Sequence, residues 1–213
     1  MICLQGGAEF TPPCRDMDAA LLEVAGATGP VVVVALAAAP GRDHEQASRH
    51  GVRHFTDLGA AALAAPDARV DPVAALSVVA TAGLVVLPGG SPARLLEGLA
   101  TTGMGEAIIE HVAAGRAVMG SSAGAMALCE VTVVPGRPPT VAPGLGLVPG
   151  CLVIPHYRGS SDWAALVPAG ITMLGLPECS GLFIEDGTAT AVGVAPSMVG
   201  DRQVRVGESG ALP

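Results

Sequence analysis

The sequence predicts an α/β fold in which helices sandwich a doubly wound, mostly parallel sheet. Half of the residues are apolar but only 2% are aromatic, which suits a core of aliphatic side chains between a sheet and helices. The apolar runs 31–36 and 84–87 show no alternation of polar and apolar residues. Strands of that kind are usually buried on both faces, as in parallel sheets covered by helices. Strand-like and helix-like segments also alternate along the chain, which is typical of this fold class.

The expected elements follow one another in a regular order. Strands are predicted over 2–4, 31–36, 84–87, 117–119, 151–154, 181–184, 190–194 and 203–206. Helices are predicted from the N-cap Asp16 to the stop at Gly26, then over 44–50 with an end at Gly51, and over 72–80, 93–99, 106–114 and 123–128. The Pro- and Gly-rich segment 131–150 is expected to be irregular or hairpin-like. No charge block or linker divides the chain, so we predict one domain over residues 1–213.

Charge and cysteine content narrow the function classes. The formal net charge of −8 is spread without a block, so we expect no nucleic acid and no membrane surface as partner. The longest apolar run, 30–40, is about half of what a spanning helix needs, and no basic segment followed by an apolar stretch opens the chain. We therefore expect a cytoplasmic protein. The five cysteines are widely spaced and form no C-x-x-C pair, which argues against a disulfide framework and a structural zinc site.

The segment GSSAGA, residues 120–125, is the strongest chemical signal in the chain. It follows the strand-like run 117–119 and opens a helix-like one, which places Ser122 at the apex of a strand–turn–helix elbow. A serine on such an elbow exposes its hydroxyl, and the N–H of the next residue, Ala123, points to where an oxyanion would form. The alternative is a turn of small residues without chemistry.

A serine hydroxyl needs a base within hydrogen-bond reach, and His156 is the best-placed histidine. Ser122, His156 and the turn Gly89-Gly90 each follow a predicted strand, and the carboxyl ends of parallel strands meet at one edge of a sheet. A core histidine without chemistry is the alternative for His156. The other four histidines are expected at the surface: His44, His50, His54 and His111.

G-x-S-x-G is also the elbow of the α/β-hydrolases, so an esterase is an alternative. In those enzymes the chain order is serine, acid, histidine, usually with several strands between them. Here Glu130 is the only acid between Ser122 and His156, and no histidine follows His156. The esterase interpretation is therefore disfavoured.

Several sequence segments, in this order along the chain, carry a family resemblance: CLQGGAEF, LVVLPGGSPARLLEGL, GRAVMGSSAGAMAL, GLGLVPGCLVIPHY and GLFIEDGTATAV. Together they resemble the S51 serine peptidases, the family of cyanophycinase and aspartyl dipeptidase E. The resemblance covers nearly the whole chain and implies a class I glutamine amidotransferase-like, flavodoxin-like fold. It implies Ser122 as nucleophile and His156 as general base, with the N–H groups of Gly90 and Ala123 as the oxyanion hole.

The chain departs from that family where an orienting acid is expected. Members usually carry an acid about midway between nucleophile and histidine, but the stretch 133–148 contains no carboxylate. Glu130 is our first choice for the third catalytic residue because it is the only acid in the interval. Glu185 or Asp186 is the alternative, and a Ser–His dyad also stays open.

The residues expected to contact the substrate also differ from those of cyanophycinases. Cyanophycinases carry Asp-Gln or Asn-Gln after the paired glycines and several arginines after the histidine, whereas this chain has Ser91-Pro92 and only Arg158. That difference disfavours a polymer of arginine and aspartate as substrate. Ser91 and Arg158 are the expected substrate-binding residues, and Arg158 could hold a carboxylate through two hydrogen bonds. An exposed loop arginine is the alternative.

We therefore expect a serine-type peptidase or amidohydrolase that cleaves a small peptide or amide through an acyl-enzyme, without a metal or other cofactor. A non-catalytic amidotransferase-like binding protein with a degraded site is the alternative. A glutamine amidotransferase is the weakest hypothesis, because the elbow has no cysteine and Arg158 stands where an acid is needed. The assembly state is left open, with a homodimer as one option.

Overall fold

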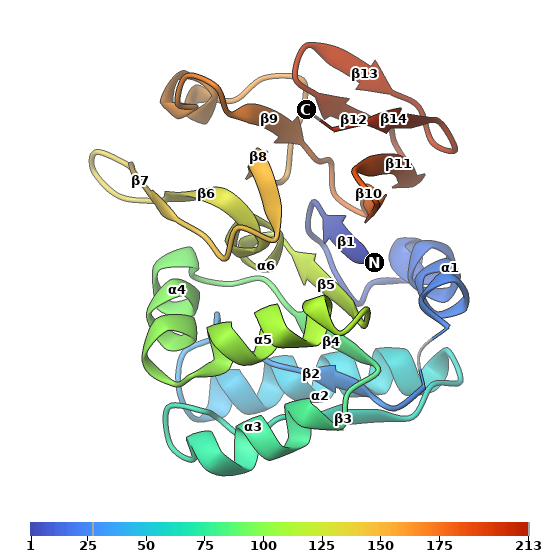
Figure 1. Ribbon diagram of the computed structural model, residues 1–213, viewed down its shortest axis with the longest axis vertical. Helices are drawn as coiled ribbons and strands as arrows, with labels where there is room; N and C mark the ends of the chain where they lie inside the picture. The colour runs from blue at the N-terminus through green and yellow to red at the C-terminus, as the bar shows by residue number, and fades with distance from the viewer. Residues whose placement is uncertain (27, 213) are drawn as a thin grey trace.

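The computed structural model describes residues 1–26 and 28–212. Within this part, the chain forms an eight-stranded sheet with the order β14-β11-β10-β1-β5-β4-β2-β3 and a six-stranded sheet with the order β13-β12-β9-β8-β6-β7 (Figure 1). The described part contains no helix that is both long and apolar enough to cross a membrane.

The larger sheet has a parallel centre. Its five neighbouring parallel strands are β3 (Ala62–Ala64), β2 (Val31–Val33), β4 (Leu84–Leu87), β5 (Ala117–Ser121) and β1 (Ile2–Gln5). Three further strands continue the sheet beyond β1, each antiparallel to its neighbour: β10 (Ser180–Glu185), β11 (Thr188–Gly193) and β14 (Ser209–Ala211). The predicted mostly parallel sheet is confirmed, although the strand expected over 31–36 already ends at Val33.

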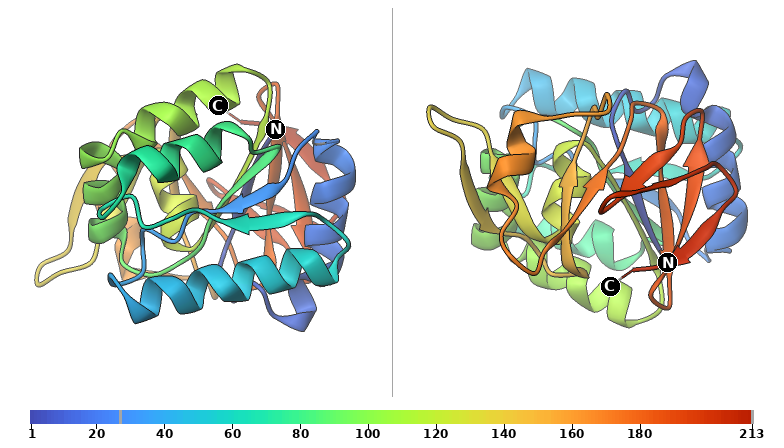
Figure 2. Two further views of the ribbon diagram at one scale, coloured as in Figure 1. Left: turned by 90° about the horizontal axis from the view of Figure 1, so that it is seen from below. Right: turned by 90° about the horizontal axis from the view of Figure 1, so that it is seen from above.

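Helices cover both faces of this sheet. One face carries α1 (Arg15–Ala25) and α2 (Arg42–Asp57), and the other carries α3 (Pro72–Ala80), α4 (Pro92–Thr101), α5 (Met104–Ala113) and α6 (Ala123–Leu128). Figure 2 shows α2 on the opposite side of β2 and β3 from α3 and α5. In β4, Val85 and Leu87 belong to one core while Leu84 and Val86 belong to the other. Burial on both faces explains why this run is apolar without alternation.

The smaller sheet was not predicted as a unit. It contains β6 (Cys129–Val134), β7 (Thr140–Pro143), β8 (Val148–Ile154), β9 (Thr172–Gly175), β12 (Ser197–Val199) and β13 (Arg202–Val204). The antiparallel pair of β6 and β7 confirms the hairpin expected within 131–150. Two short 3-10 helices complete the described elements: η1 (Pro12–Cys14) and η2 (Asp162–Leu166).

The helix predicted over 44–50 does not end at Gly51. Helix α2 continues through this glycine to Asp57, because Gly51 is a packing position and not a stop. A Cβ at Gly51 would lie only 2.9 Å from Cγ2 of Val33 and 3.0 Å from Cζ of Phe10. The missing side chain therefore lets α2 lie close against β2.

The placement of three histidines, two on α2 and one on α5, also differs from the prediction. His44 and His54 are only 6% exposed and His111 is 2% exposed, so the expectation that they lie at the surface was wrong. His54 lies on the buried face of α2, and its Nε2 is 2.7 Å from Oδ2 of the buried Asp18. His50 is exposed, as expected.

Candidate active site

Ser122 lies between the end of β5 and the start of α6, at the elbow predicted from the sequence. Its φ of 48° and ψ of −110° lie in a region that residues with a side chain seldom adopt. Such strained backbone is found preferentially at functional sites. The Ser122 N–H donates to the carbonyl of Gln5 at 2.9 Å, which ties the elbow to the end of β1. Ser122 is half-buried, and its hydroxyl takes part in a contact with His156.

Two glycines allow the elbow to be this tight. A Cβ at Gly124 would lie 2.0 Å from the carbonyl oxygen of Leu87, and one at Gly120 would lie 2.4 Å from the carbonyl carbon of Gly124. Helix α6 therefore packs directly on the ends of β4 and β5. The small residues of GSSAGA are a steric requirement for this close packing.

A chain of polar contacts runs from Ser122 through His156 to Glu178. The Ser122 Oγ lies 3.1 Å from His156 Nε2, and His156 Nδ1 lies 2.9 Å from Glu178 Oε1. The His156 and Glu178 side chains are 47% and 50% exposed, so the site opens to solvent. If Nδ1–H donates to the carboxylate, Nε2 is left to accept the Ser122 hydroxyl proton.

The turn after β1 holds all three segments of this site. The carbonyls of Gln5, Gly6 and Gly7 accept, in that order, the N–H groups of Ser122, His156 and Cys179, at 2.9, 2.8 and 3.0 Å. Glu178 directly precedes Cys179 in the chain. Three consecutive peptide groups thus fix the elbow, the histidine segment and the carboxylate segment relative to one another.

Gly7 also supplies the surface on which the imidazole rests. A Cβ at this position would lie 2.3 Å from Cε1 and 2.8 Å from Nδ1 of His156. The φ of Gly7 is +129°, a value that other residues rarely adopt. Glycine is therefore needed here both for the path of the turn and for the position of the ring.

The model of peptidase family S51 matches residues 2–193 of this chain, which include all of the contacts described above. The chain belongs to peptidase family S51. Two solved structures share the fold of this S51 chain. A peptidase from an acI-B1 Actinobacterium has a TM-score of 0.83 and 24% identity, over 99% of this chain and 96% of its own. A putative peptidase E protein from Listeria monocytogenes EGD-e has a TM-score of 0.66 and 17% identity, over 91% and 98%. No protein with a curated description matches significantly.

The two N–H groups expected to form the oxyanion hole flank the S51 elbow. Among the residues that the structure describes, the N–H groups of Gly90 and Ala123 donate to no protein acceptor. A Cβ at Gly89 would lie 3.2 Å from the Ser122 Cβ, so the paired-glycine turn is directly beside the serine. Neither of these two N–H groups is thus engaged by an acceptor of the described chain.

Glu130 does not reach His156. Its Oε2 accepts a hydrogen bond from the Gly150 N–H at 2.7 Å, on the exposed side of β6. The carboxylate in contact with the imidazole belongs to Glu178, which the sequence interpretation missed. Glu130 therefore has the role of tying β6 to β8, and Glu178 replaces it at the imidazole.

Glu185 and Asp186 lie at the far end of the sheet. In the antiparallel pair of β1 and β10, Ile184 lies opposite Ile2, whereas Gly181 lies opposite Gln5. The elbow is tied to the Gln5 end, so Glu185, the last residue of β10, and Asp186, which follows it, lie at the edge away from Ser122.

The two residues expected to bind substrate have ordinary surroundings. Ser91 caps α4, since its Oγ accepts from the Arg94 N–H at 3.3 Å, and its own N–H donates to Ala37. Arg158 is exposed in the segment after His156. It makes no hydrogen bond or ion pair with any residue in the described ranges.

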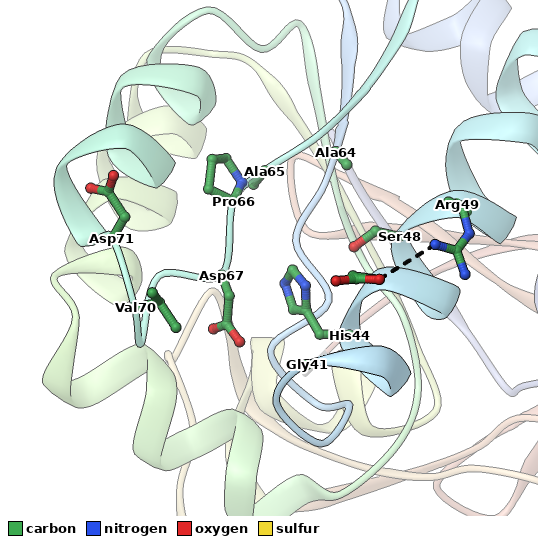
Figure 3. A pocket seen from close by; sticks show the side chains of 11 residues that line it. Gly41, His44, Ser48, Arg49, Ala64, Ala65, Pro66, Asp67, Val70 and Asp71 are labelled. Atoms are coloured by element: carbon green, nitrogen blue, oxygen red, sulfur yellow. Dashed lines mark ion pairs between the residues drawn. The ribbon is translucent and has the colours of Figure 1, made fainter.

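A cavity of about 500 Å³ lies between α2 and the segment that follows β3 (Figure 3), and neither Ser122, His156 nor Glu178 lines it. His44 and Ser48 of α2 line it, facing the segment 64–71. Burial lowers the pKa of His44, so the ring is held neutral.

Across residues 1–26 and 28–212, no group of three His, Cys, Asp or Glu side chains could hold a metal ion.

Glu178 could have been found if the predicted strand 181–184 had been recognised as antiparallel to the first strand. It stands three residues before the predicted strand 181–184, which turns out to be antiparallel to β1. The start of an antiparallel strand lies at the same edge as the carboxyl ends of the parallel strands. An acid in front of such a strand is therefore a candidate, even though it follows the histidine in the chain.

Proposed function

We propose that this S51 chain is a serine-type peptidase or amidohydrolase that cleaves a small peptide or amide substrate through an acyl-enzyme. The observation that carries the proposal is the continuous contact from Ser122 Oγ through the His156 ring to Glu178, with distances of 3.1 and 2.9 Å. Nucleophile, base and orienting acid are the three roles that such an arrangement serves in serine hydrolases.

The reaction follows from the position of each group. His156 Nε2 accepts the Ser122 proton as Oγ attacks the scissile carbonyl carbon, and Glu178 holds the ring in the tautomer with its proton on Nδ1. The N–H groups of Gly90 and Ala123 stabilise the negative oxygen of the tetrahedral intermediate. His156 then gives its proton to the leaving amine. Water, activated by the same imidazole, hydrolyses the acyl-enzyme, and the scheme uses no metal or organic cofactor.

The alternative of a degraded, non-catalytic site was supported by the missing acid between Ser122 and His156. Glu178 removes that support, because a carboxylate contacts His156 Nδ1 from a later part of the chain.

The proposal is tested with a panel of dipeptides and aminoacyl p-nitroanilides. Wild-type protein should hydrolyse at least one member, and Ser122→Ala should reduce that activity to background while it keeps its circular dichroism spectrum. Hydrolysis that persists in Ser122→Ala, or its absence from the wild type across both substrate classes, would contradict the proposal.

A further inference from the structure

His44 and Ser48 form a polar pair that has no role in the proposed reaction. They lie one turn apart on the same face of α2 and line the cavity of about 500 Å³ shown in Figure 3. His44 is 6% exposed and Ser48 only 3%. Polar side chains at that depth are nearly always hydrogen-bonded, so both are expected to have partners.

The protein supplies no partner for the Ser48 hydroxyl. Within residues 1–26 and 28–212, its Oγ is buried without a hydrogen-bond partner. A serine inside a helix often donates to the carbonyl four residues earlier, as Ser77 does to Val73 at 2.8 Å. The Ser48 hydroxyl makes no such bond, and its side chain faces the segment 64–71 across the cavity (Figure 3).

The His44 ring has unused hydrogen-bonding capacity as well. No hydrogen bond or ion pair in the described part of the chain includes either of its nitrogens. Of the described side-chain atoms that are fully buried and unpartnered, none belongs to His44, so its ring nitrogens reach the cavity surface. Burial lowers the pKa of His44, so near neutral pH the ring offers one N–H donor and one acceptor nitrogen.

The opposite wall of the cavity is largely apolar. It is formed by small and aliphatic residues of the segment that ends and follows β3: Ala64, Ala65, Pro66 and Val70. Sites for small organic molecules combine apolar walls with a few polar groups, and a volume of about 500 Å³ is within their usual range. The cavity therefore suits a molecule with a compact apolar body and one polar end.

The charges around the cavity favour an uncharged ligand. The charged residues that line it are three carboxylates and one guanidinium: Glu45, Asp67, Asp71 and Arg49. This excess of negative charge repels an anion. Both oxygens of Asp67 are bound by Arg69, at 2.8 and 2.9 Å, so the charge of that carboxylate is already compensated. A cation against the His44 ring is disfavoured by the same burial that keeps the imidazole neutral.

A carboxamide is the uncharged group that complements this pair of side chains. It carries N–H donors and a carbonyl acceptor, while a neutral imidazole and a hydroxyl can each donate and accept. Side chains four residues apart on a helix have Cβ atoms about 5–6 Å apart, a spacing that one planar amide can bridge.

We propose that this cavity is a second ligand site, which binds an uncharged molecule with a compact apolar body and a carboxamide group held by His44 and Ser48. The amide N–H donates to the acceptor nitrogen of His44, and the amide carbonyl accepts the Ser48 hydroxyl. The site is independent of the proposed hydrolase function, because neither Ser122, His156 nor Glu178 lines the cavity.

Four probes of nearly the same shape test this chemistry: benzamide, acetophenone, benzoate and benzamidine. Each is titrated near neutral pH into wild-type protein labelled with nitrogen-15, and the backbone amide shifts of residues 41–49 and 64–71 report binding. Benzamide should shift these residues with a Kd of about 1 mM or tighter, which is ordinary for a ligand of its size. Acetophenone lacks the donor and should bind about 3- to 10-fold more weakly. Benzoate and benzamidine, which are charged, should bind at least about 10-fold more weakly.

Two variants separate ligand binding from folding. His44→Phe keeps a ring and removes both nitrogens, and it should weaken benzamide binding at least about 10-fold. Ser48→Ala should weaken it about 3- to 10-fold. Because the Ser48 hydroxyl has no partner in the described chain, Ser48→Ala should not lower the urea midpoint of unfolding, whereas loss of a structural hydrogen bond would. Ser77→Ala is the matched control on α3 and should leave benzamide binding unchanged.

The outcomes are distinct. Saturable benzamide shifts in 41–49 and 64–71 that weaken in both variants support the second site. No saturable shift in these segments, an affinity for benzoate or benzamidine equal to that for benzamide, or an affinity unchanged by either substitution would overturn it. Shifts confined to residues around Ser122 would place the amide in the proposed active site and would also overturn it. Should one variant not fold, the wild-type probe series and the other variant still decide.

Discussion

Oε1 of Glu178 lies 2.9 Å from Nδ1 of His156, although 22 residues separate them in the chain. His156 follows β8 of the smaller sheet, whereas Glu178 stands between β9 and β10, where the chain passes from the smaller sheet to the larger one. The turn after β1 holds both segments, since Gly6 binds the His156 N–H and Gly7 binds the Cys179 N–H. The contact is thus a product of the topology and not of a local motif.

The first prediction concerns this carboxylate. Glu178→Gln should lower kcat by about four orders of magnitude, the loss typical when the orienting acid of a triad becomes an amide, because the ring is then held in the wrong tautomer. Steady-state kinetics on the best panel substrate measures the effect. Glu130→Gln is the matched control and should change kcat less than about threefold, since Glu130 bonds Gly150. Equal losses in both variants would remove Glu178 from the proposed role.

The second prediction concerns the glycine under the imidazole. Gly7→Ala should abolish activity, because the new Cβ would lie 2.3 Å from His156 Cε1 and must displace the ring. Gly115→Ala is a suitable comparison, as Gly115 also has a positive φ, +78°, but nothing within 4 Å of the added Cβ. That control should cost only about 1–2 kcal/mol of stability and leave kcat unchanged. An active, folded Gly7→Ala enzyme would show that the ring position is not critical.

The third prediction concerns the pH dependence of stability. Burial lowers the pKa of His44 and His111 below their ordinary value of 6.5, and His111 Nε2 bonds the carbonyl of Ala117. On acidification, the unfolded chain takes up these protons first, so the free energy of unfolding falls below about pH 6.5. The slope is up to about 1.4 kcal/mol per pH unit for each histidine. The stability that the two neutral histidines contribute is fully present above their pKa in the unfolded chain. It is lost as the pH falls toward their lower pKa in the folded protein.

Urea unfolding at several pH values between about 5 and 7.5 measures how the free energy of unfolding changes with pH. His111→Asn should be less stable at neutral pH but show a shallower decline in acid, whereas His50→Gln, at an exposed position, should behave as the wild type. An unchanged slope in His111→Asn would mean that His111 does not contribute to the decline.

The parallel half of the fold could be predicted because its physical signals are local. Val31–Val33 and Leu84–Leu87 are buried on both faces and therefore show no alternation, and Gly26 ends α1 in the left-handed conformation, as predicted. Gly51 misled the prediction because a glycine used for packing in a helix cannot be told locally from one that ends it. The smaller sheet depends on pairings between distant strands, such as β8 with β9, which no local pattern reveals.

In the candidate site, too, some residues could be predicted from local sequence signals and others depend on contacts between distant parts of the chain. Ser122 and His156 follow strands that could be recognised, so their place at one edge of the sheet could be inferred. Glu178 lies in a turn whose position depends on tertiary structure. Chain order favoured Glu130, but order along the chain does not determine which carboxylate reaches the imidazole.

The most direct test of the account is the site of covalent labelling by a fluorophosphonate, mapped by peptide mass spectrometry. The probe should add once to wild-type protein, at Ser122, because within residues 1–26 and 28–212 this is the one hydroxyl in hydrogen-bond contact with His156 Nε2, at 3.1 Å. Ser121→Ala should label like the wild type, while Ser122→Ala should not label, with both variants folded by circular dichroism. Labelling that maps to Ser121, or that survives in Ser122→Ala, would contradict Ser122 as the nucleophile, and so would a wild type that the probe leaves unmodified.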